Sequence, residues 1–201
     1  MEYQGLTRDD LNNVHALNRA WLEQRAARDA VPSSPQRRER LADTPFLLFS
    51  FREAESQLWQ KLLGDQPHAD LFESPPEPRS RELQVAGLGF LWELGRRNPY
   101  VARIVSGAPL DWCDQLAAQT LVRVLECARG ANLLAPRFDE DSPLQRRLYV
   151  HGGSALREAR RSAQLAALQA MLTLSDSARY GRLATAACRM PTLATEVGNK
   201  V

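Results

Sequence analysis

In the middle of the chain, helix-ending residues follow one another so closely that only short helices fit between them. Asn98-Pro99 is typical of a helix start, because asparagine caps the first free N–H groups and proline fits the first helical position. Gly107 ends that helix, Thr120 can cap a later one, and Gly130 ends it in turn. Breaks of one to three residues force sharp turns, so the sequence predicts a compact cluster of three short helices over residues 99–130, not a long antiparallel bundle.

Apolar residues at helical spacing also dominate the rest of the chain. They predict helices over residues 7–30, 52–64, 82–97, 143–150 and 155–174, and a weaker separate helix over 178–189. Two short apolar stretches, at 44–51 and 133–138, are candidates for strands, and the first could instead lead into the helix that follows it. The expected fold class is therefore mostly α: a compact multi-helix domain with a helix-turn-helix-like unit and at most two short strands.

Prolines and polar residues mark the boundaries of the expected domains. The polar stretch 31–40 holds two prolines and is expected to be a loop. Residues 66–80 contain four prolines and form the clearest linker. We therefore expect an N-terminal helical segment over 1–64 with a short possible strand, a proline-rich linker over 65–80, a helical domain over 81–190 and a disordered tail over 191–201.

One weak internal repeat is present. Ala42 precedes Leu47-Leu48 by five residues, and Ala128 precedes Leu133-Leu134 by the same interval. The aromatic residue that follows is out of register by one position. We interpret the repeat as a coincidence, with a duplicated helix–strand unit as the alternative.

Several classes of protein are disfavoured by the composition. No run approaches 18 apolar residues, so no transmembrane helix is expected, and the N-terminus has neither the basic nor the apolar region of a secretory signal. Three cysteines are too few for a disulfide framework and lack metal-ligand spacing, which favours a cytoplasmic location. Since no motif of a hydrolase nucleophile, a nucleotide-binding loop or a zinc site is present, we expect no enzyme, no cofactor and no metal.

Charge is distributed unevenly along the chain. Residues 1–141 carry 17 basic and 21 acidic side chains, whereas residues 142–201 carry 9 basic and 3 acidic ones. A basic segment is a candidate surface for nucleic-acid phosphates, to which arginine makes bidentate contacts. The alternative is a solvated, arginine-rich helix face. The candidate phosphate contacts are Arg146, Arg147, Arg157, Arg160 and Arg161, the last three of which share one helical face.

Residues 109–129 have the length of a helix-turn-helix unit, in which two short helices are joined tightly in front of a third element. The small residues Ala117 and Ala118 would let the two helices approach each other. The exposed side chains of the second helix would be Arg123, Glu126 and Arg129, and the two arginines are further candidate contacts for nucleic acid. An ordinary corner between two helices is an equally valid interpretation.

The segment from about residue 87 to residue 141 resembles FlhD, one subunit of the bacterial flagellar master transcriptional activator. The shared pattern is a helix, a Gly-containing break, the sequence L-A-x-x-T-L and a leucine-rich extended piece that ends in R-F-D. In this sequence these positions are Leu116, Ala117, Thr120, Leu121, Leu133, Leu134, Arg137, Phe138 and Asp139. The resemblance implies an α-helical, homo-oligomerising regulator that acts with a second subunit on promoter DNA. Relatives of that activator also occur on conjugative mobile elements.

Three features thus favour a bacterial, transcription-regulator-like, DNA-associated protein that acts with a partner subunit: the short helices, the basic segment and the FlhD-like pattern. The alternative is a protein–protein interaction module, or an accessory subunit of a bacterial assembly, without nucleic acid. The four tryptophans, Trp21, Trp59, Trp92 and Trp112, fit that alternative, because exposed tryptophan is common at partner surfaces. In the leading interpretation we expect a homo-oligomer in the cytoplasm, with no membrane contact.

Overall fold

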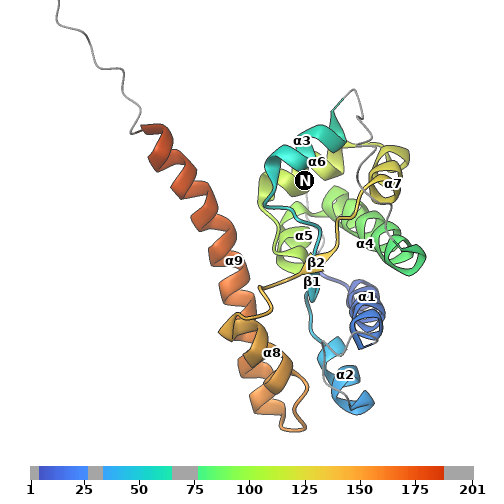
Figure 1. Cartoon of the computed structure of the whole chain (residues 1–201), viewed down its shortest axis with the longest axis vertical. Helices are drawn as coiled ribbons and strands as arrows, with labels where there is room; N and C mark the ends of the chain where they lie inside the picture. Colours follow the sequence, from blue (N-terminus) through green and yellow to red (C-terminus); the bar gives the residue numbers. More distant parts are fainter. Residues whose placement is uncertain (1–4, 27–33, 65–76, 188–201) are drawn as a thin grey trace, which may run out of the picture.

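The computed structural model describes residues 5–26, 34–64 and 77–187, with side chains up to residue 173. This part of the chain forms nine helices and one two-stranded sheet, so the prediction of a mostly α fold is confirmed (Figure 1). The elements are α1 (Arg8–Ala26), α2 (Pro35–Ala42), β1 (Phe49–Ser50), α3 (Ser56–Leu63), α4 (Pro78–Arg97), α5 (Pro99–Ser106), α6 (Leu110–Ala118), α7 (Leu121–Gly130), β2 (Ala135–Pro136), α8 (Pro143–Gly152) and α9 (Arg157–Ala187).

Local capping signals place most of these helix ends where the sequence predicts them. The Asn98 side chain accepts hydrogen bonds from the backbone N–H groups of Tyr100 and Val101, at 3.0 and 3.2 Å, and so satisfies two free donors of α5. At the other end of α5, Gly107 has a φ of 69°, the left-handed conformation that glycine adopts without strain. The Thr120 hydroxyl caps α7 by accepting from Arg123 N at 3.3 Å.

Three predicted boundaries are wrong. The expected loop over residues 31–40 contains the start of α2 at Pro35, because proline at the first helical position loses no hydrogen bond. The expected linker over 65–80 overlaps α4, which begins at Pro78 for the same reason, and residues 65–76 lie outside the described residues. The expected separate helix over 178–189 is the continuation of α9, which runs to Ala187. The expected disordered tail, 191–201, lies outside the described residues.

The segments on both sides of residues 65–76 share one hydrophobic core. Helix α4 packs against α1, α5, α6 and α7 and lies at its centre. The apolar stretch 44–51 crosses this core with its large side chains almost completely buried. Only Phe49 and Ser50 of this stretch form a strand, and they pair antiparallel with Pro136 and Ala135. Both stretches expected to contain strands therefore contain one, and the two strands are each other's partners.

Two buried amide side chains fix the extended stretches that lead into these strands. Asn18 of α1 is fully buried; its Nδ2 donates to the carbonyls of Ala42 at 3.3 Å, Thr44 at 3.2 Å and Phe46 at 2.9 Å. Its Oδ1 accepts from Leu48 N at 2.9 Å. One side chain thus satisfies four backbone groups that a buried, non-helical segment could not leave unpaired.

Gln84 of α4 does the same for the second stretch. Its Nε2 donates to the carbonyls of Ala128 and Ala131, at 2.8 and 2.9 Å, and its Oε1 accepts from the N–H groups of Leu133 and Leu134. A shift of 86 residues relates Ala42 to Ala128, Leu47-Leu48 to Leu133-Leu134, and β1 to β2. The weak repeat in the sequence therefore occupies equivalent places in the fold, with α1 and α4 each supplying the amide.

The structure does not confirm the predicted helix-turn-helix pair of α6 and α7. Each packs mainly against α4, and contacts between α6 and α7 themselves are few. In a helix-turn-helix unit the two helices pack on each other so that the second can enter a groove of DNA. The helix-turn-helix part of the fold prediction is therefore not confirmed.

Helices α8 and α9 form a hairpin that packs on the rest of the molecule through α2 and α5. From α2, Arg37 donates to Val150 O at 2.9 Å, and Arg40 donates to Gly153 O at 3.1 Å, so both satisfy carbonyls at the end of α8. On the α5 side, Met171 of α9 lies against Gly107, where a Cβ would come within 2.2 Å of the Met171 side chain. The second half of α9 extends beyond the other helices (Figure 1).

Candidate nucleic-acid interface

The α8–α9 hairpin carries most of the arginines predicted to contact phosphate. Between residues 142 and 173 the sequence has five arginines and a single carboxylate, Glu158. Four of the arginines, Arg146, Arg147, Arg157 and Arg161, are exposed. The structure therefore brings five of the seven predicted contacts onto one pair of packed helices.

Six arginines in the other described parts of the molecule form ion pairs with carboxylates. Arg52 lies 2.7 Å from Glu55, Arg97 lies 2.5 Å from Asp10, and Arg137 lies 3.5 Å from Glu53 in the core. Further ion pairs join Arg19 to Glu39, Arg25 to Glu140 and Arg123 to Glu126. The charges of these arginines are thus balanced within the protein itself.

The hairpin arginines lack such partners. Within the part of the chain that the structure describes, Arg146, Arg157 and Arg161 make no ion pair with a carboxylate. Arg147 donates only to a neutral group, the hydroxyl of Ser162, at 3.3 Å. The hairpin therefore presents a net positive charge to solvent, with five arginines and one carboxylate between residues 142 and 173.

Arg160 does not share the face of Arg157 and Arg161 in the way that helical spacing suggests. Its guanidinium folds back and donates to Ser154 O at 2.8 Å and Ala155 O at 3.0 Å. These carbonyls belong to the turn between α8 and α9. Arg160 therefore stabilises the turn, and its charge is less available to a ligand than that of its neighbours.

The two predicted contacts on α7 lie apart from the hairpin, on the other side of the molecule in Figure 1. Arg123 is committed to the packing of α7 on α3, because its guanidinium donates to Leu62 O at 2.8 Å and Gly64 O at 2.6 Å. Arg129 is exposed near the end of α7. Of the two candidates on α7, Arg123 thus has a structural role, and Arg129 is exposed but far from the other exposed candidates on the hairpin.

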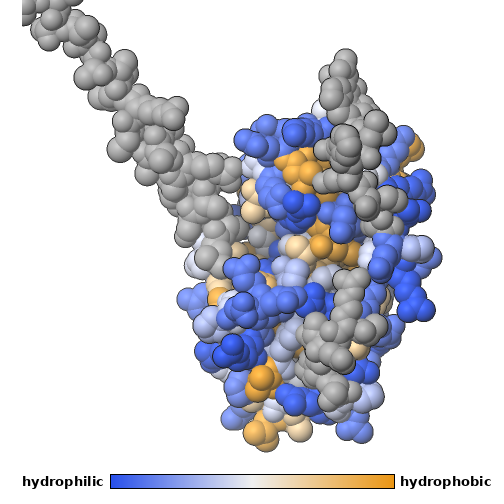
Figure 2. Space-filling view, in the orientation of Figure 1, coloured by the Kyte–Doolittle hydropathy of each residue, from blue (hydrophilic) through white to orange (hydrophobic). Residues whose placement is uncertain are grey.

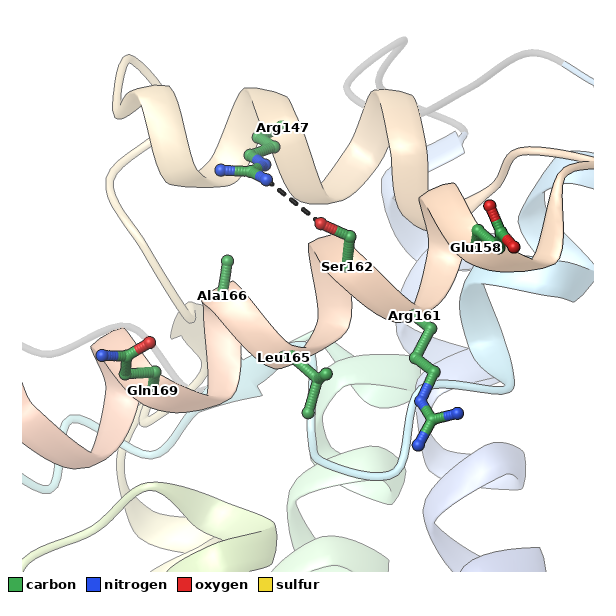
Figure 3. A pocket seen from close by; sticks show the side chains of 7 residues that line it. All are labelled: Arg147, Glu158, Arg161, Ser162, Leu165, Ala166 and Gln169. Atoms are coloured by element: carbon green, nitrogen blue, oxygen red, sulfur yellow. Dashed lines mark hydrogen bonds between the residues drawn. The ribbon is translucent and has the colours of Figure 1, made fainter.

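A shallow hollow of about 450 Å³ lies on the hairpin, open to solvent (Figure 3). Its lining residues are Arg147 from α8 and Glu158, Arg161, Ser162, Leu165, Ala166 and Gln169 from α9. In the close view, Arg147 and Arg161 lie on opposite sides of the α9 backbone. The hollow was not predicted from the sequence, although the α9 residues that line it recur at intervals of three and four, which places them on one helical face.

Apolar side chains lie at the edge of the basic surface that Arg146, Arg147, Arg157 and Arg161 form on the hairpin. Leu165 is 57% exposed, and Val150 and Leu156, on either side of the α8–α9 turn, are 48% and 71% exposed. Figure 2 shows a face that is mostly hydrophilic, with smaller hydrophobic areas near its upper and lower ends. The basic surface therefore borders apolar side chains.

The tryptophans are not free for a partner in the way that the alternative function would use them. Trp21, Trp59 and Trp112 are at most 5% exposed. Trp92 is half-buried; its Nε1 donates to Gln119 O at 2.8 Å, and the Arg96 guanidinium stacks 4.9 Å from its ring centre. The indole rings therefore serve mainly the core and the packing between helices.

The two described cysteine thiols, Cys113 and Cys127, are buried. Burial raises the pKa of the Cys113 thiol to about 12, and burial also raises the pKa of Cys127, so neither forms a reactive thiolate near neutral pH. No cluster of three or more metal-ligating side chains occurs in the parts described. None of the described helices has the length and apolar character needed to cross a membrane.

The residues that carry the FlhD-like pattern are divided between the core and the surface: three are buried, and Thr120, Leu121 and Asp139 are exposed. Leu116 and Leu133 are at most 1% exposed, and Phe138 is 7% exposed. The buried positions of the pattern therefore describe how this region packs. Comparisons with family models, with curated proteins and with solved structures find no match to this chain.

Proposed function

We propose that this chain is a cytoplasmic, bacterial DNA-associated regulatory protein that contacts the phosphate backbone through its α8–α9 hairpin. The observation that carries the proposal is the contrast between arginines. Six arginines in the other described parts of the molecule form ion pairs with carboxylates, whereas Arg146, Arg157 and Arg161 are exposed without such a partner. Unpaired, exposed guanidinium groups bind phosphate and release the counterions that surround DNA.

Backbone contacts hold a protein on DNA but do not read its sequence. We therefore propose that a second subunit, as the FlhD-like pattern implies, supplies the choice of promoter. On this proposal the chain alone binds any duplex, weakly and with strong salt dependence.

Multi-angle light scattering of the purified chain tests the expected homo-oligomer directly.

The test is a fluorescence-anisotropy titration of a random DNA duplex at several salt concentrations. If four arginines each neutralise one phosphate, the slope of log K against log salt is about −3.6, a loss of about 100-fold between 50 and 200 mM salt. Replacing Arg157 and Arg161 by Gln should reduce the slope by about 2. The matched control is R19Q with R96Q, which removes the same charge from arginines engaged with Glu39 and Trp92.

Two results would refute the proposal. One is the absence of binding at low salt both for the chain alone and for the chain with added cell extract as a source of a second subunit. The other is an equal loss of slope in the hairpin variant and in the control. Equal loss would mean that net charge matters and that the hairpin does not.

A second candidate function is a protein-interaction module without nucleic acid. It is favoured by exposed apolar residues at the start of α7, where Val122 is 67% and Leu121 is 41% exposed. If this is the function, replacing Val122 by Asp should abolish capture of a partner and leave the fold intact. The DNA titration separates the two functions, because an interaction module shows no salt-dependent binding to a random duplex.

A further inference from the structure

We infer that helix α3 carries a second contact for the DNA backbone, at Lys61, in the position that Arg147 occupies on α8. The inference rests on the proposed function and goes beyond it, because it places a contact outside the α8–α9 hairpin. It follows from a pseudo-twofold symmetry that relates the part of the chain with α1, α2 and α3 to the part with α4, α7 and α8.

The elements on both sides of the two strands recur at an interval of 86 or 87 residues. Helix α2 begins at Pro35, directly after a serine, and α7 begins at Leu121, directly after a threonine. Strands β1 and β2 follow at the same interval, and α3 and α8 then begin at Ser56 and Pro143. The order helix, strand, helix therefore occurs twice, with α5 and α6 inserted ahead of the second occurrence.

Two arginines hold the ends of α3 and α8 in the same way. Arg37 of α2 donates to Val150 O at 2.9 Å, and Arg123 of α7 donates to Gly64 O at 2.6 Å. The donor and the acceptor are each displaced by 86 residues. Each arginine thus binds a carbonyl at the end of a helix from the other half of the chain, where carbonyls lack partners within the helix. Because both ends of this contact recur at the same interval, α3 and α8 have equivalent places in the fold.

The β1–β2 ladder contains the axis of this symmetry. Phe49 pairs with Pro136 and Ser50 with Ala135, so exchanging the two halves of the chain turns each pair into the other. In Figure 1, α3 and α7 lie above the ladder, and α8 and α2 lie below it. A pseudo-twofold axis between the strands therefore relates α3 to α8 and α7 to α2.

This symmetry relates Lys61 of α3 to Arg147 of α8, and Gln60 to Arg146. All four side chains are exposed. Lys61 makes no ion pair within the described residues, and α3 itself contains no carboxylate. Helix α3 therefore presents an unpaired cation next to an amide N–H donor, and both kinds of group contact DNA phosphates.

Two related cations fit duplex DNA, because its backbones are themselves related by two-fold axes. Proteins with two-fold symmetry contact equivalent groups on the two halves of a site. Lysine can take the place of arginine in such a pair, since it binds phosphate as a point charge. The partner inferred for Lys61 and Arg147 is therefore one duplex.

The symmetry is tested without DNA, by hydrogen-exchange mass spectrometry. Loss of a hydrogen bond from a charged donor should speed amide exchange about tenfold at the end of the helix that it holds. We therefore expect R37A to act on α8 and R123A to act on α3, while the control R8A, at the start of α1, affects neither. Unchanged exchange in α3 and α8 would remove the symmetry and overturn the inference.

The contact itself is tested by the salt dependence of binding to a random duplex. A fifth contact steepens the slope of log K against log salt from about −3.6 to about −4.5, and K61Q should return it to about −3.6. K61R should keep the full slope. The matched control is R8Q, which removes one exposed positive charge outside α3 and α8 and should change the slope much less.

The outcomes separate this inference from the proposed function. Equal slopes for K61Q and R8Q would overturn the contact at Lys61, and a steep slope of the unmodified chain would still support the hairpin as a DNA-binding surface. Absence of binding to any duplex would overturn both. Vesicles of phosphatidylglycerol offer the same phosphate chemistry without two-fold symmetry. Binding to them that is as tight as binding to DNA, with the same response to K61Q, would overturn the assignment to nucleic acid.

Discussion

Replacing Asn18 by Ala should destabilise the protein more than any exposed substitution of the same kind. The side chain is fully buried and joins four backbone groups of the stretch 42–48 through hydrogen bonds of 2.9 to 3.3 Å. A hydrogen bond inside a protein contributes about 1 kcal/mol net, and a buried group left unpaired costs about 1 to 3 kcal/mol. Since water does not reach this position, we expect a loss of about 4 kcal/mol in the free energy of unfolding.

The assay is urea denaturation followed by tryptophan fluorescence and circular dichroism. For a chain of this size the slope of stability against urea is about 2 kcal/mol per molar, so the midpoint should fall by about 2 M. The control is N13A on the exposed face of α1, which should change stability by less than about 0.5 kcal/mol. A loss below about 1 kcal/mol for N18A, with the slope unchanged, would refute the idea that this amide organises the buried stretch.

Three further predictions concern single residues. Replacing Gly107 by Ala should lower the free energy of unfolding by about 2 kcal/mol, because its φ of 69° is unfavourable for alanine and a Cβ would displace Met171. Thermal unfolding measures this change, and an unchanged melting temperature would contradict it. In the native protein Cys113 should resist alkylation at pH 8, because burial raises its pKa to about 12, and it should react only after unfolding in urea. Mass spectrometry detects the label, and rapid labelling of the native protein would disprove burial. Although burial opposes ionisation of Asp10, the hydrogen bond from Arg97 lowers its pKa, so its contribution to stability is present above pH 4 and lost as the pH falls further. The stability difference between wild type and D10N should therefore shrink below about pH 4, and a difference that stays constant with pH would contradict this.

Helix ends were predictable because their signals are local. Asn98, Gly107 and Thr120 act on backbone groups within a few residues, so the sequence around them is enough to identify the cap. The error at Pro35 arose because proline both interrupts and begins helices, and the polar residues after it show no apolar periodicity. Only Leu41 and Ala42, at the end of α2, are buried.

Long-range roles were not predictable in the same way. Asn18 and Gln84 are ordinary polar residues in their helices, and their partners lie 24 to 50 residues further along the chain. The arginines were also indistinguishable by sequence. Arg123 packs α7 onto α3, whereas Arg161 remains exposed on α9, and only the neighbours supplied by the fold separate the two. A count of charges along the sequence locates a basic region but does not show which arginines pack against other helices and which remain exposed.

The pairing of β1 with β2 has a consequence for how the molecule unfolds. A ladder of two residue pairs is too small to persist alone, so it forms only while the stretches held by Asn18 and Gln84 are both in place. Loss of either stretch removes the partner of the other. The ladder therefore couples the N-terminal helices thermodynamically to α4 and α7, and the chain should unfold in one cooperative transition across the proline-rich stretch that divides its sequence.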